Sequence, residues 1–174
     1  MRDSLIHRVV HLGEEAVRAY NNDSTVSFAL LVRAILETSA LMFTLDKDIA
    51  RAIEIGNTNE LEDRLHKTTI GSRNDSTPET AVNALTCLGK LDKKYSGIRK
   101  YYDDLSEFCH PNFYGVLSTY SSVSEDGQFK FGAHKGTGIK LGVAPLKIGI
   151  LIAAIYYDEI HVKYNELLRV CYSA

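Results

Sequence analysis

Apolar residues recur along most of the chain at the spacing of a helix rather than in the alternation typical of strands. Leu5, Val9 and Ala16 belong to a stripe that predicts a first helix from about residue 3 to 20. The stretch from about residue 25 to 46 is apolar on nearly every side, which predicts a second helix near the centre of the fold. Further helical patterns are expected at about 48–56, 59–67, 78–94, 98–110 and 145–170.

One stretch breaks the helical pattern. Residues 116–142 contain TYSSV and QFKFG, which favour strands, with a Glu-Asp-Gly turn signal between them. They predict a small β-hairpin inserted into a helical protein, whereas the polar segment 68–80 predicts a loop. No inter-domain linker interrupts the pattern, so we expect one domain, residues 1–174, with an all-α fold: an antiparallel helical bundle carrying a β-hairpin.

Composition narrows the class of protein further. The 174 residues are 45% hydrophobic and 24% charged, which suits a single domain that buries one core. The formal net charge of −2 gives no overall basic signature, so extended non-specific DNA binding is not expected. The three cysteines form no CxxC pair, and the first residues lack the apolar run of a signal peptide. These features predict a cytoplasmic protein.

Two apolar stretches have the composition of membrane spans. Residues 25–45 are mostly apolar, but Arg33 and Glu37 lie at the centre, where each charge would cost about 3 kcal/mol in a bilayer. The uncharged stretch at 148–157 has 10 residues, half of the length that a span requires. We therefore expect two buried helices and no membrane partner.

The charges least compatible with their surroundings are Arg33 and Glu37. They are four residues apart and share a helix face with apolar residues such as Ala40. Burying the pair is costly unless the two groups pair and find further hydrogen bonds. Two interpretations stay open: the pair bridges neighbouring helices, or it contacts a ligand. Asp158 lies on an apolar stripe of the last predicted helix and is expected to be a buried acid that partners Arg33 or His110.

A second group of candidates lies in LSEFCHPNFYG, residues 105–115. Helical spacing places Glu107 outward, Cys109 inward as an inert core thiol, and Ser106 and His110 on a flank that could face a groove. Because His110 stands in the last turn, it could equally stabilise the helix C-terminus through the helix dipole.

No pattern supports a metal or a cofactor. His7 and His11 have the spacing of ligands on one helix, but two histidines on an exposed face are more often solvated. The glycine-rich segment 132–142 lacks the spacing and the ending of a phosphate-binding loop. We therefore expect no metal site and no cofactor.

The segments RAILE (33–37) and YDDLSEFCHPNFYG (102–115) together resemble a group of poorly characterised bacterial helical proteins. Those proteins carry an Arg-x3-Glu on an early apolar helix and a later LSE-x2-HPN-x2-G, preceded by a segment like LGKLDKKYSG (88–97). The group is similar to the HEPN superfamily, helical bundles found in toxin–antitoxin, abortive-infection and other defence systems. The resemblance spans roughly residues 25–120 and implies an all-α HEPN-like bundle, often a dimer, and in many members metal-independent RNA cleavage.

The chain departs from the HEPN ribonuclease signature, in which an Arg is followed after four to six residues by a His. Asp103, Asp104 and Leu105 occupy the positions where His110 would require that Arg. Such a nuclease needs a histidine near the 2′-hydroxyl and a cation that stabilises the phosphorane charge. Arg33 could supply this cation from another helix, and Arg73 in the loop at 68–80 is a second candidate.

These observations lead to one predicted site and two hypotheses for function. We expect Arg33, Glu37, Ser106, His110 and Asn112 to converge between the second helix and the helix at 98–110. The first hypothesis is a non-catalytic interaction or sensing module, in bacterial defence, in which the polar site orders the fold or binds a small anion or nucleotide. The partners to expect are a second copy of the chain, and RNA or a small anionic ligand. The alternative is a metal-independent endoribonuclease with His110 as the acid–base group and Arg33 as the phosphate clamp.

Overall fold

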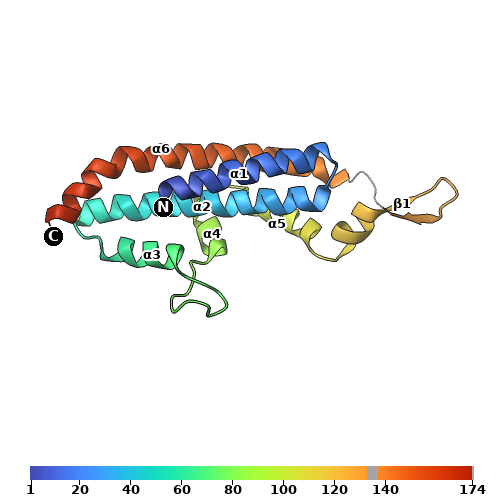
Figure 1. The fold of residues 1–174 in the computed structure, drawn as a ribbon. Helices are drawn as coiled ribbons and strands as arrows, with labels where there is room; N and C mark the ends of the chain where they lie inside the picture. The colour runs from blue at the N-terminus through green and yellow to red at the C-terminus, as the bar shows by residue number, and fades with distance from the viewer. Residues whose placement is uncertain (133–136, 174) are drawn as a thin grey trace.

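The computed structural model describes residues 1–132 and 137–173, and it is mostly helical with one small antiparallel sheet (Figure 1). This confirms the predicted combination of an all-α fold with a β-hairpin. The elements in chain order are α1 (Arg2–Asn21), α2 (Thr25–Ile55), α3 (Asn59–Thr69), α4 (Ala84–Lys94), α5 (Ile98–Cys109), the π-helical turn η1 (Phe113–Ser118), β1 (Ser121–Val123), β2 (Phe129–Phe131), the 3-10 helix η2 (Thr137–Gly142) and α6 (Val143–Ser173).

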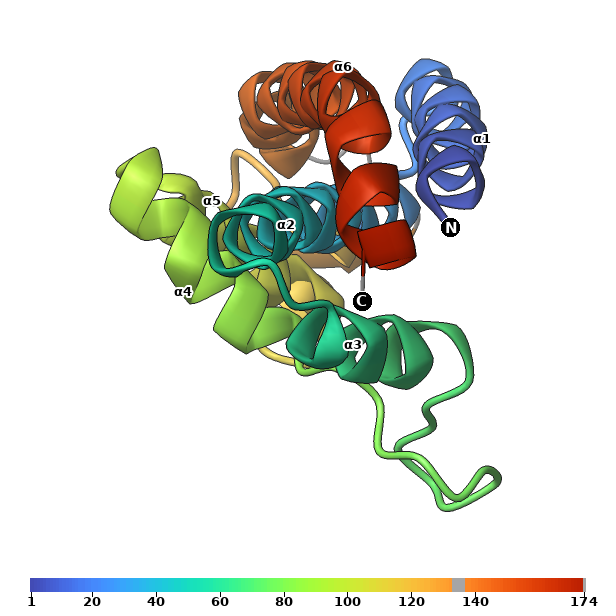
Figure 2. The same cartoon turned by 90° about the vertical axis from the view of Figure 1, so that its left-hand side faces the viewer.

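Helix α2 lies at the centre of the bundle, as its all-round apolar sequence predicts. It contacts each of α1, α3, α4, α5 and α6. In Figure 2, α1 and α6 lie along one side of α2, while α4 and α5 lie along another. Phe28, Ile35, Leu36 and Met42 of α2 are all almost fully buried. The buried Ser39 hydroxyl donates hydrogen bonds to the carbonyl oxygens of Ile35 and Gly149, at 2.8 Å each, and so links α2 to α6.

The predicted end of the second helix near Asp46 is wrong. Helix α2 continues without a break to Ile55, so the separate short helix expected at 48–56 is its last part. Asp46 is buried within this helix, and Lys163 of α6 bonds to its carboxylate, which offsets the cost of burying the charge. The predicted stop at Gly56 is confirmed, since this glycine has φ 65° and forms the left-handed C-cap that ends a helix.

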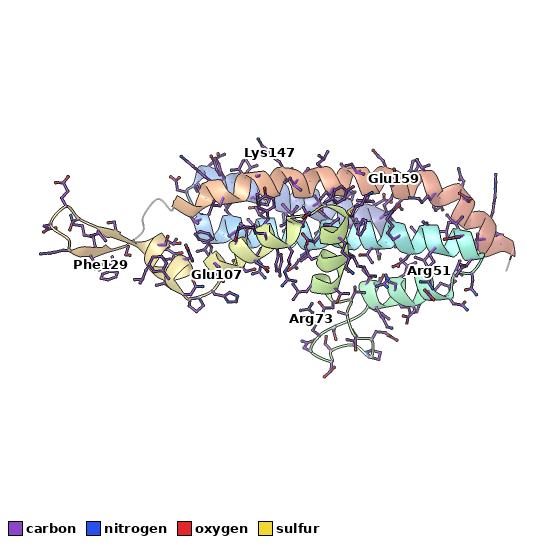
Figure 3. All side chains as sticks on the ribbon, turned by 180° about the vertical axis from the view of Figure 1, so that it is seen from behind. Arg51, Arg73, Glu107, Phe129, Lys147 and Glu159 are labelled. Carbon is purple, nitrogen blue, oxygen red and sulfur yellow. The ribbon has the colours of Figure 1, made fainter. Side chains whose placement is uncertain are left out.

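The helix expected from Pro78 begins later, at Ala84. The Asn83 side chain caps it by accepting a hydrogen bond from the Leu85 amide at 2.9 Å. Residues 70–83 form no helix, and an isolated bridge joins Ser72 to Thr80. Figure 3 shows this polar loop, which carries Arg73, extending away from the helices.

The predicted hairpin at 116–142 is shorter than expected. Its strands cover three residues each and pair antiparallel, with Ser122 opposite Lys130. The turn η1 precedes them and η2 follows them, while the expected return at 133–136 lies outside the described residues. Together η1, β1 and β2 form an arm, residues 113–131, that projects beyond one end of the helical bundle (Figure 1).

Helices α2 and α6 are long and apolar enough to cross a membrane by length and composition. In the most apolar window of α2, 56% is buried inside the protein, against 39% for α6. Core helices of soluble proteins pass the same test, so the two helices are weak evidence for a membrane. The charged Arg33 and Glu37 of α2 are half-buried within the protein, as their surroundings predict.

Candidate functional site

The Arg33 and Glu37 side chains meet at one residue of α5, Tyr102. Arg33 Nη2 donates a hydrogen bond of 2.7 Å to the Tyr102 hydroxyl, which donates one of 2.7 Å to Glu37 Oε1. The Arg33 guanidinium also lies 4.7 Å from the centre of the Tyr102 ring, within range of a cation–π contact. The hydroxyl thus connects both charges of the pair and ties α2 to α5.

The electrostatics of this cluster follow from burial and hydrogen bonding. Burial is the largest influence on Tyr102, and with the Glu37 carboxylate it raises the pKa of the phenol above its usual range. Burial alone would lower the pKa of Arg33, but the hydrogen bond with the Tyr102 hydroxyl and the nearby Cys109 side chain outweigh it, so that this pKa is raised. The hydroxyl therefore stays protonated and the guanidinium stays charged at neutral pH.

One hydrogen-bond donor of Arg33 has no acceptor among the described residues. Its Nε is buried and has no hydrogen-bond partner among the described residues. An unsatisfied buried N–H costs roughly 1–3 kcal/mol, and a small acceptor beside it would recover part of that cost. This donor is the clearest sign that the cluster could bind a small polar molecule or anion.

The structure places the other predicted site residues differently. The half-buried Ser106 hydroxyl donates a 2.7 Å bond to the carbonyl oxygen of Tyr102 in its own helix, and among the described residues it forms no hydrogen bond with Arg33. His110 is exposed and follows α5 in an extended conformation, which the next residue, Pro111, favours. Its imidazole has no hydrogen-bond partner within residues 1–132 and 137–173.

Asn112 holds the base of the arm. Its Oδ1 accepts a 3.0 Å bond from the Gly115 amide and caps η1, and its Nδ2 donates a 2.7 Å bond to Glu107 Oε2. Glu107 is exposed, as predicted, and is labelled in Figure 3. A side chain on Gly115 would overlap the carbonyl oxygen of His110, so the close approach of η1 to α5 requires glycine.

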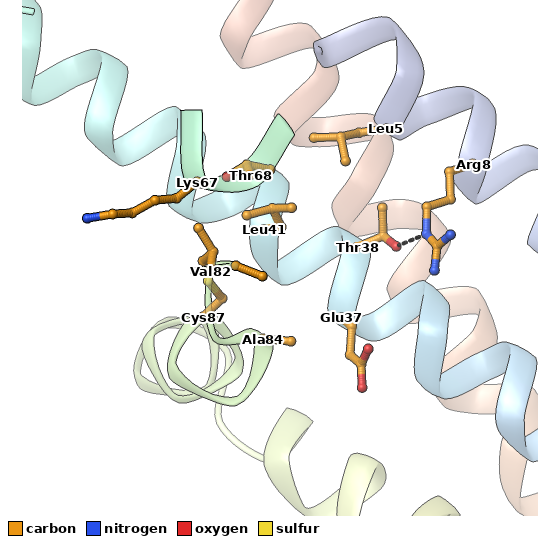
Figure 4. A pocket seen from close by; sticks show the side chains of 11 residues that line it. Leu5, Arg8, Glu37, Thr38, Leu41, Lys67, Thr68, Val82, Ala84 and Cys87 are labelled. Atoms are coloured by element: carbon orange, nitrogen blue, oxygen red, sulfur yellow. Dashed lines mark hydrogen bonds between the residues drawn. The ribbon is translucent and has the colours of Figure 1, made fainter. Parts of the chain in front are cut away.

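Glu37 also lines a cavity of about 180 Å³ on the side of α2 that faces α1, α3 and α4 (Figure 4). Arg8 Nε donates a 3.2 Å bond to the Thr38 hydroxyl there, while Lys67 extends away and pairs with Asp63 at 2.7 Å. Pockets for drug-sized ligands measure about 300–1,000 Å³. This cavity therefore fits a few waters or a small ion rather than a nucleotide.

Sequence reasoning missed Tyr102, although a signal existed. Tyr102 lies on the buried stripe of α5 with Ile98 and Leu105, and a buried tyrosine usually finds a partner for its hydroxyl. It also missed Asp46, whose side chain is 1% exposed. Lys163 bonds to Asp46 Oδ1, and Lys47 Nζ lies 3.3 Å from Oδ2. No local sequence pattern predicts the pairing of Asp46 with Lys163, because the two residues are 117 positions apart.

Two further expectations are settled by burial. Asp158 was expected to be buried, and this is wrong, because its side chain is exposed on α6. Cys109 is half-buried, and its thiol donates to the carbonyl oxygen of Leu105 at 3.3 Å, consistent with a core thiol. Among the described residues, no group of three or more His, Cys, Asp or Glu side chains is arranged to hold a metal ion.

The structure thus brings together Arg33 and Glu37, through Tyr102, and leaves His110 and Asn112 in other surroundings. Comparison of the chain with models of protein families, with curated proteins and with solved structures finds no match in any of the three.

Proposed function

We propose that the protein is a non-catalytic, HEPN-like interaction module that binds a partner protein through its projecting arm. In this proposal it acts in the bacterial cytoplasm, in the defence setting that the sequence resemblance implies. The Arg33–Tyr102–Glu37 cluster orders the helices that carry the arm. Two features support the proposal: the exposed apolar side chains of the arm and the internal hydrogen bonds of the cluster.

The observation that carries the proposal is the apolar surface of the arm. Isolated exposed apolar residues are ordinary, but contiguous apolar patches mark interaction sites. Phe131 is 75% exposed, and its ring lies nearly parallel to that of Phe129, 6.2 Å away, on one face of β2. The exposed large apolar residues of the arm are Phe113, Tyr114, Val116, Leu117, Tyr120, Val123, Phe129 and Phe131.

The arm is anchored well enough to present this surface. The Tyr114 ring packs against Phe108 of α5 with 5.7 Å between centroids, and against Phe113 at 5.4 Å. Asn112 caps η1 at the junction with α5. A surface held on a structured base loses less conformational entropy on binding than a free tail.

The charges of the arm favour a protein partner over RNA. Residues 113–131 carry two carboxylates, Glu125 and Asp126, and one ammonium, Lys130. Aromatic side chains can stack on bases, but binding of nucleic acid also needs cations along the phosphate backbone. The arm has no such row of cationic side chains, and binding to an apolar protein surface does not require one.

The test starts from the arm itself. A photo-crosslinking amino acid replaces Phe131 in the full chain expressed in its native host, and the same amino acid replaces Lys94 on α4 as the control. We expect an adduct with a defined protein at the first position alone. Binding of that purified partner should then weaken at least about 100-fold in Phe129→Ser/Phe131→Ser, as for hot-spot residues. Leu85→Ser, at an exposed leucine of α4, should bind as the wild type does.

Absence of a position-specific adduct, or equal binding by the double variant, would contradict the proposal. Circular dichroism of each variant checks that the helices are retained.

The second candidate function is metal-independent RNA cleavage by His110 and Arg33. It is favoured by one observation: the buried Nε–H of Arg33 has no acceptor among the described residues, and a phosphate oxygen could accept from it. Incubation of the purified protein with total RNA and EDTA, beside His110→Ala, separates the two functions. Cleavage that is lost in His110→Ala would replace our proposal with the nuclease, and intact RNA supports the interaction module.

A further inference from the structure

Helix α6 carries an apolar face that no other element of the described structure covers. Leu151 is 60% exposed and Val162 77% exposed, and Ile150, Ala154 and Ile155 are exposed beside them. Figure 3 shows the outer side of α6, with Lys147 and Glu159 labelled along it. Because apolar side chains on a helix normally face a core, this face indicates a missing partner.

The apolar surface continues from α6 onto α1. A groove between the two helices is lined by Val10 and Val17 of α1 and by Ile150 and Ala154 of α6. Val10 and Val17 are 53% and 52% exposed. Gly13 lies at the floor of the groove, where an added Cβ would be 3.6 Å from Ile150 Cδ1. The joint face of α1 and α6 is therefore wider than one helix.

Two opposite charges stand on the same face of α6. Lys147 and Asp158 are both exposed, and neither has an ion-pair or hydrogen-bond partner in the described part of the chain. They are eleven residues apart. At 100° per residue, their directions around the helix axis differ by about 20° after three full turns. The two side chains consequently lie almost in line, roughly 16 Å apart along the axis, with Leu151 and Ala154 between them.

We propose that a second copy of the chain packs on this face, with α6 antiparallel to its counterpart and the twofold axis between residues 152 and 153. This register places Lys147 of each copy at the height of Asp158 of the other, so two ion pairs form. The same axis sets Ile150 at the height of Ile155 and Leu151 at the height of Ala154. A twofold interface requires such self-complementarity, because one patch must fit itself.

The size of the face suits a dimer. Helix α6 has 31 residues and α1 has 20, so they extend about 46 and 30 Å. Two adjacent helices about 10 Å apart present a face on the order of 600–800 Å². Stable interfaces bury roughly 800 Å² on each partner.

A membrane is a poorer partner for the same face. Lys147, Asp158 and His161 lie among the apolar side chains of α6, and all three are exposed. Insertion of charged residues into a bilayer costs about 3 kcal/mol each at the centre. In the dimer the lysine and the aspartate pair instead, and such pairs give specificity of register.

The test is a charge exchange in the full-length chain, measured by sedimentation equilibrium. Wild type is expected at twice the 19.4 kDa chain mass. Lys147→Glu and Asp158→Lys each oppose like charges twice across the axis and should weaken the dimer at least about tenfold. Lys147→Glu/Asp158→Lys restores opposite charges and should return the wild-type dissociation constant. Leu151→Asp should give monomer.

Matched controls separate this surface from others. Leu85→Asp and Lys93→Glu on α4 repeat the same chemistry at exposed positions and should remain dimeric. Phe131→Ser should also remain dimeric, so a failure here and a failure of the arm proposal are distinguishable. Circular dichroism verifies the fold of each variant.

Three results would overturn the inference. The first is wild-type protein that stays monomeric at about 1 mM. The second is a charge exchange that fails to restore a dimer lost in both single variants, since only the proposed register predicts rescue. The third is a monomer that cosediments with phosphatidylcholine–phosphatidylglycerol vesicles through Leu151, which would assign the face to a membrane.

Discussion

Removal of the Tyr102 hydroxyl tests how the buried charges of α2 are held. In Tyr102→Phe the ring remains, so its packing in α5 and the cation–π contact with Arg33 are retained. What is lost is the oxygen that accepts from Arg33 Nη2 and donates to Glu37 Oε1, at 2.7 Å in both cases. Both charged groups then lose a partner while they stay half-buried.

The expected loss in the free energy of unfolding is about 2 kcal/mol. Hydrogen bonds to charged groups contribute roughly 1.5–3 kcal/mol each, and water can partly replace them because neither charge is fully buried. For a chain of this length, 1 kcal/mol changes the melting temperature by roughly 2–4 °C, so Tm should fall by about 4–8 °C.

Urea unfolding followed by circular dichroism measures this change, with Tyr101→Phe as the matched control. Tyr101 is the neighbouring half-buried tyrosine of α5, and its hydroxyl has no hydrogen bond among the described residues. A double-mutant cycle with Glu37→Gln then measures the coupling between Tyr102 and Glu37. If Tyr102→Phe costs no more than Tyr101→Phe, the hydroxyl does not hold the pair, and the structural argument for the cluster fails.

Three further perturbations follow from other parts of the bundle. Lys163→Met should cost about 3 kcal/mol in urea unfolding, because the Asp46 carboxylate stays buried and keeps Lys47 as its one ion-pair partner among the described residues. Asp46→Asn in the same chain should recover most of that loss. Burial and the hydroxyl of a neighbouring tyrosine raise the pKa of Tyr156. As pH rises, the Tyr156 hydroxyl therefore loses its proton in the unfolded chain before it does in the folded protein. The free energy of unfolding of the wild type should fall above about pH 10, and that of Tyr156→Phe should fall less, as measured by urea unfolding over this pH range. Gly115→Ala should speed amide hydrogen exchange in the arm without changing exchange in α2, whereas Gly89→Ala, which has open space around it, should leave the arm unchanged.

The sequence alone determined most of the helical pattern. Apolar spacing located α1, and the all-round apolar composition of α2 placed it at the centre, because burying such a helix needs neighbours on every side. Gly56 marked a helix end, since a left-handed C-cap favours glycine, although the sequence did not show that α2 runs unbroken to it. The burial of Arg33 and Glu37 also followed from their neighbours on the helix.

Local pattern could not give the partners of polar groups. By local sequence Asp46 looks like the end of a helix. In the structure it lies inside α2, where Lys163 of α6 bonds to its carboxylate. In the sequence nothing distinguishes Tyr102 from the other tyrosines. In the structure its hydroxyl bonds to two charged residues of another helix, Arg33 and Glu37. Hydrogen bonds between residues about 65–117 positions apart depend on how helices pack, and periodicity within one helix carries no information about that.

The exposed face of α6 is a second case in which tertiary packing, and not the sequence pattern, decided the outcome. The sequence established that Leu151, Ile155 and Val162 share a stripe with Asp158, and this predicted a buried stripe. Only the tertiary structure decided that the opposite side of α6 packs on α2 and that this stripe meets solvent. A helix that is apolar on most sides can turn several faces inward, and the neighbouring helices select which one is buried.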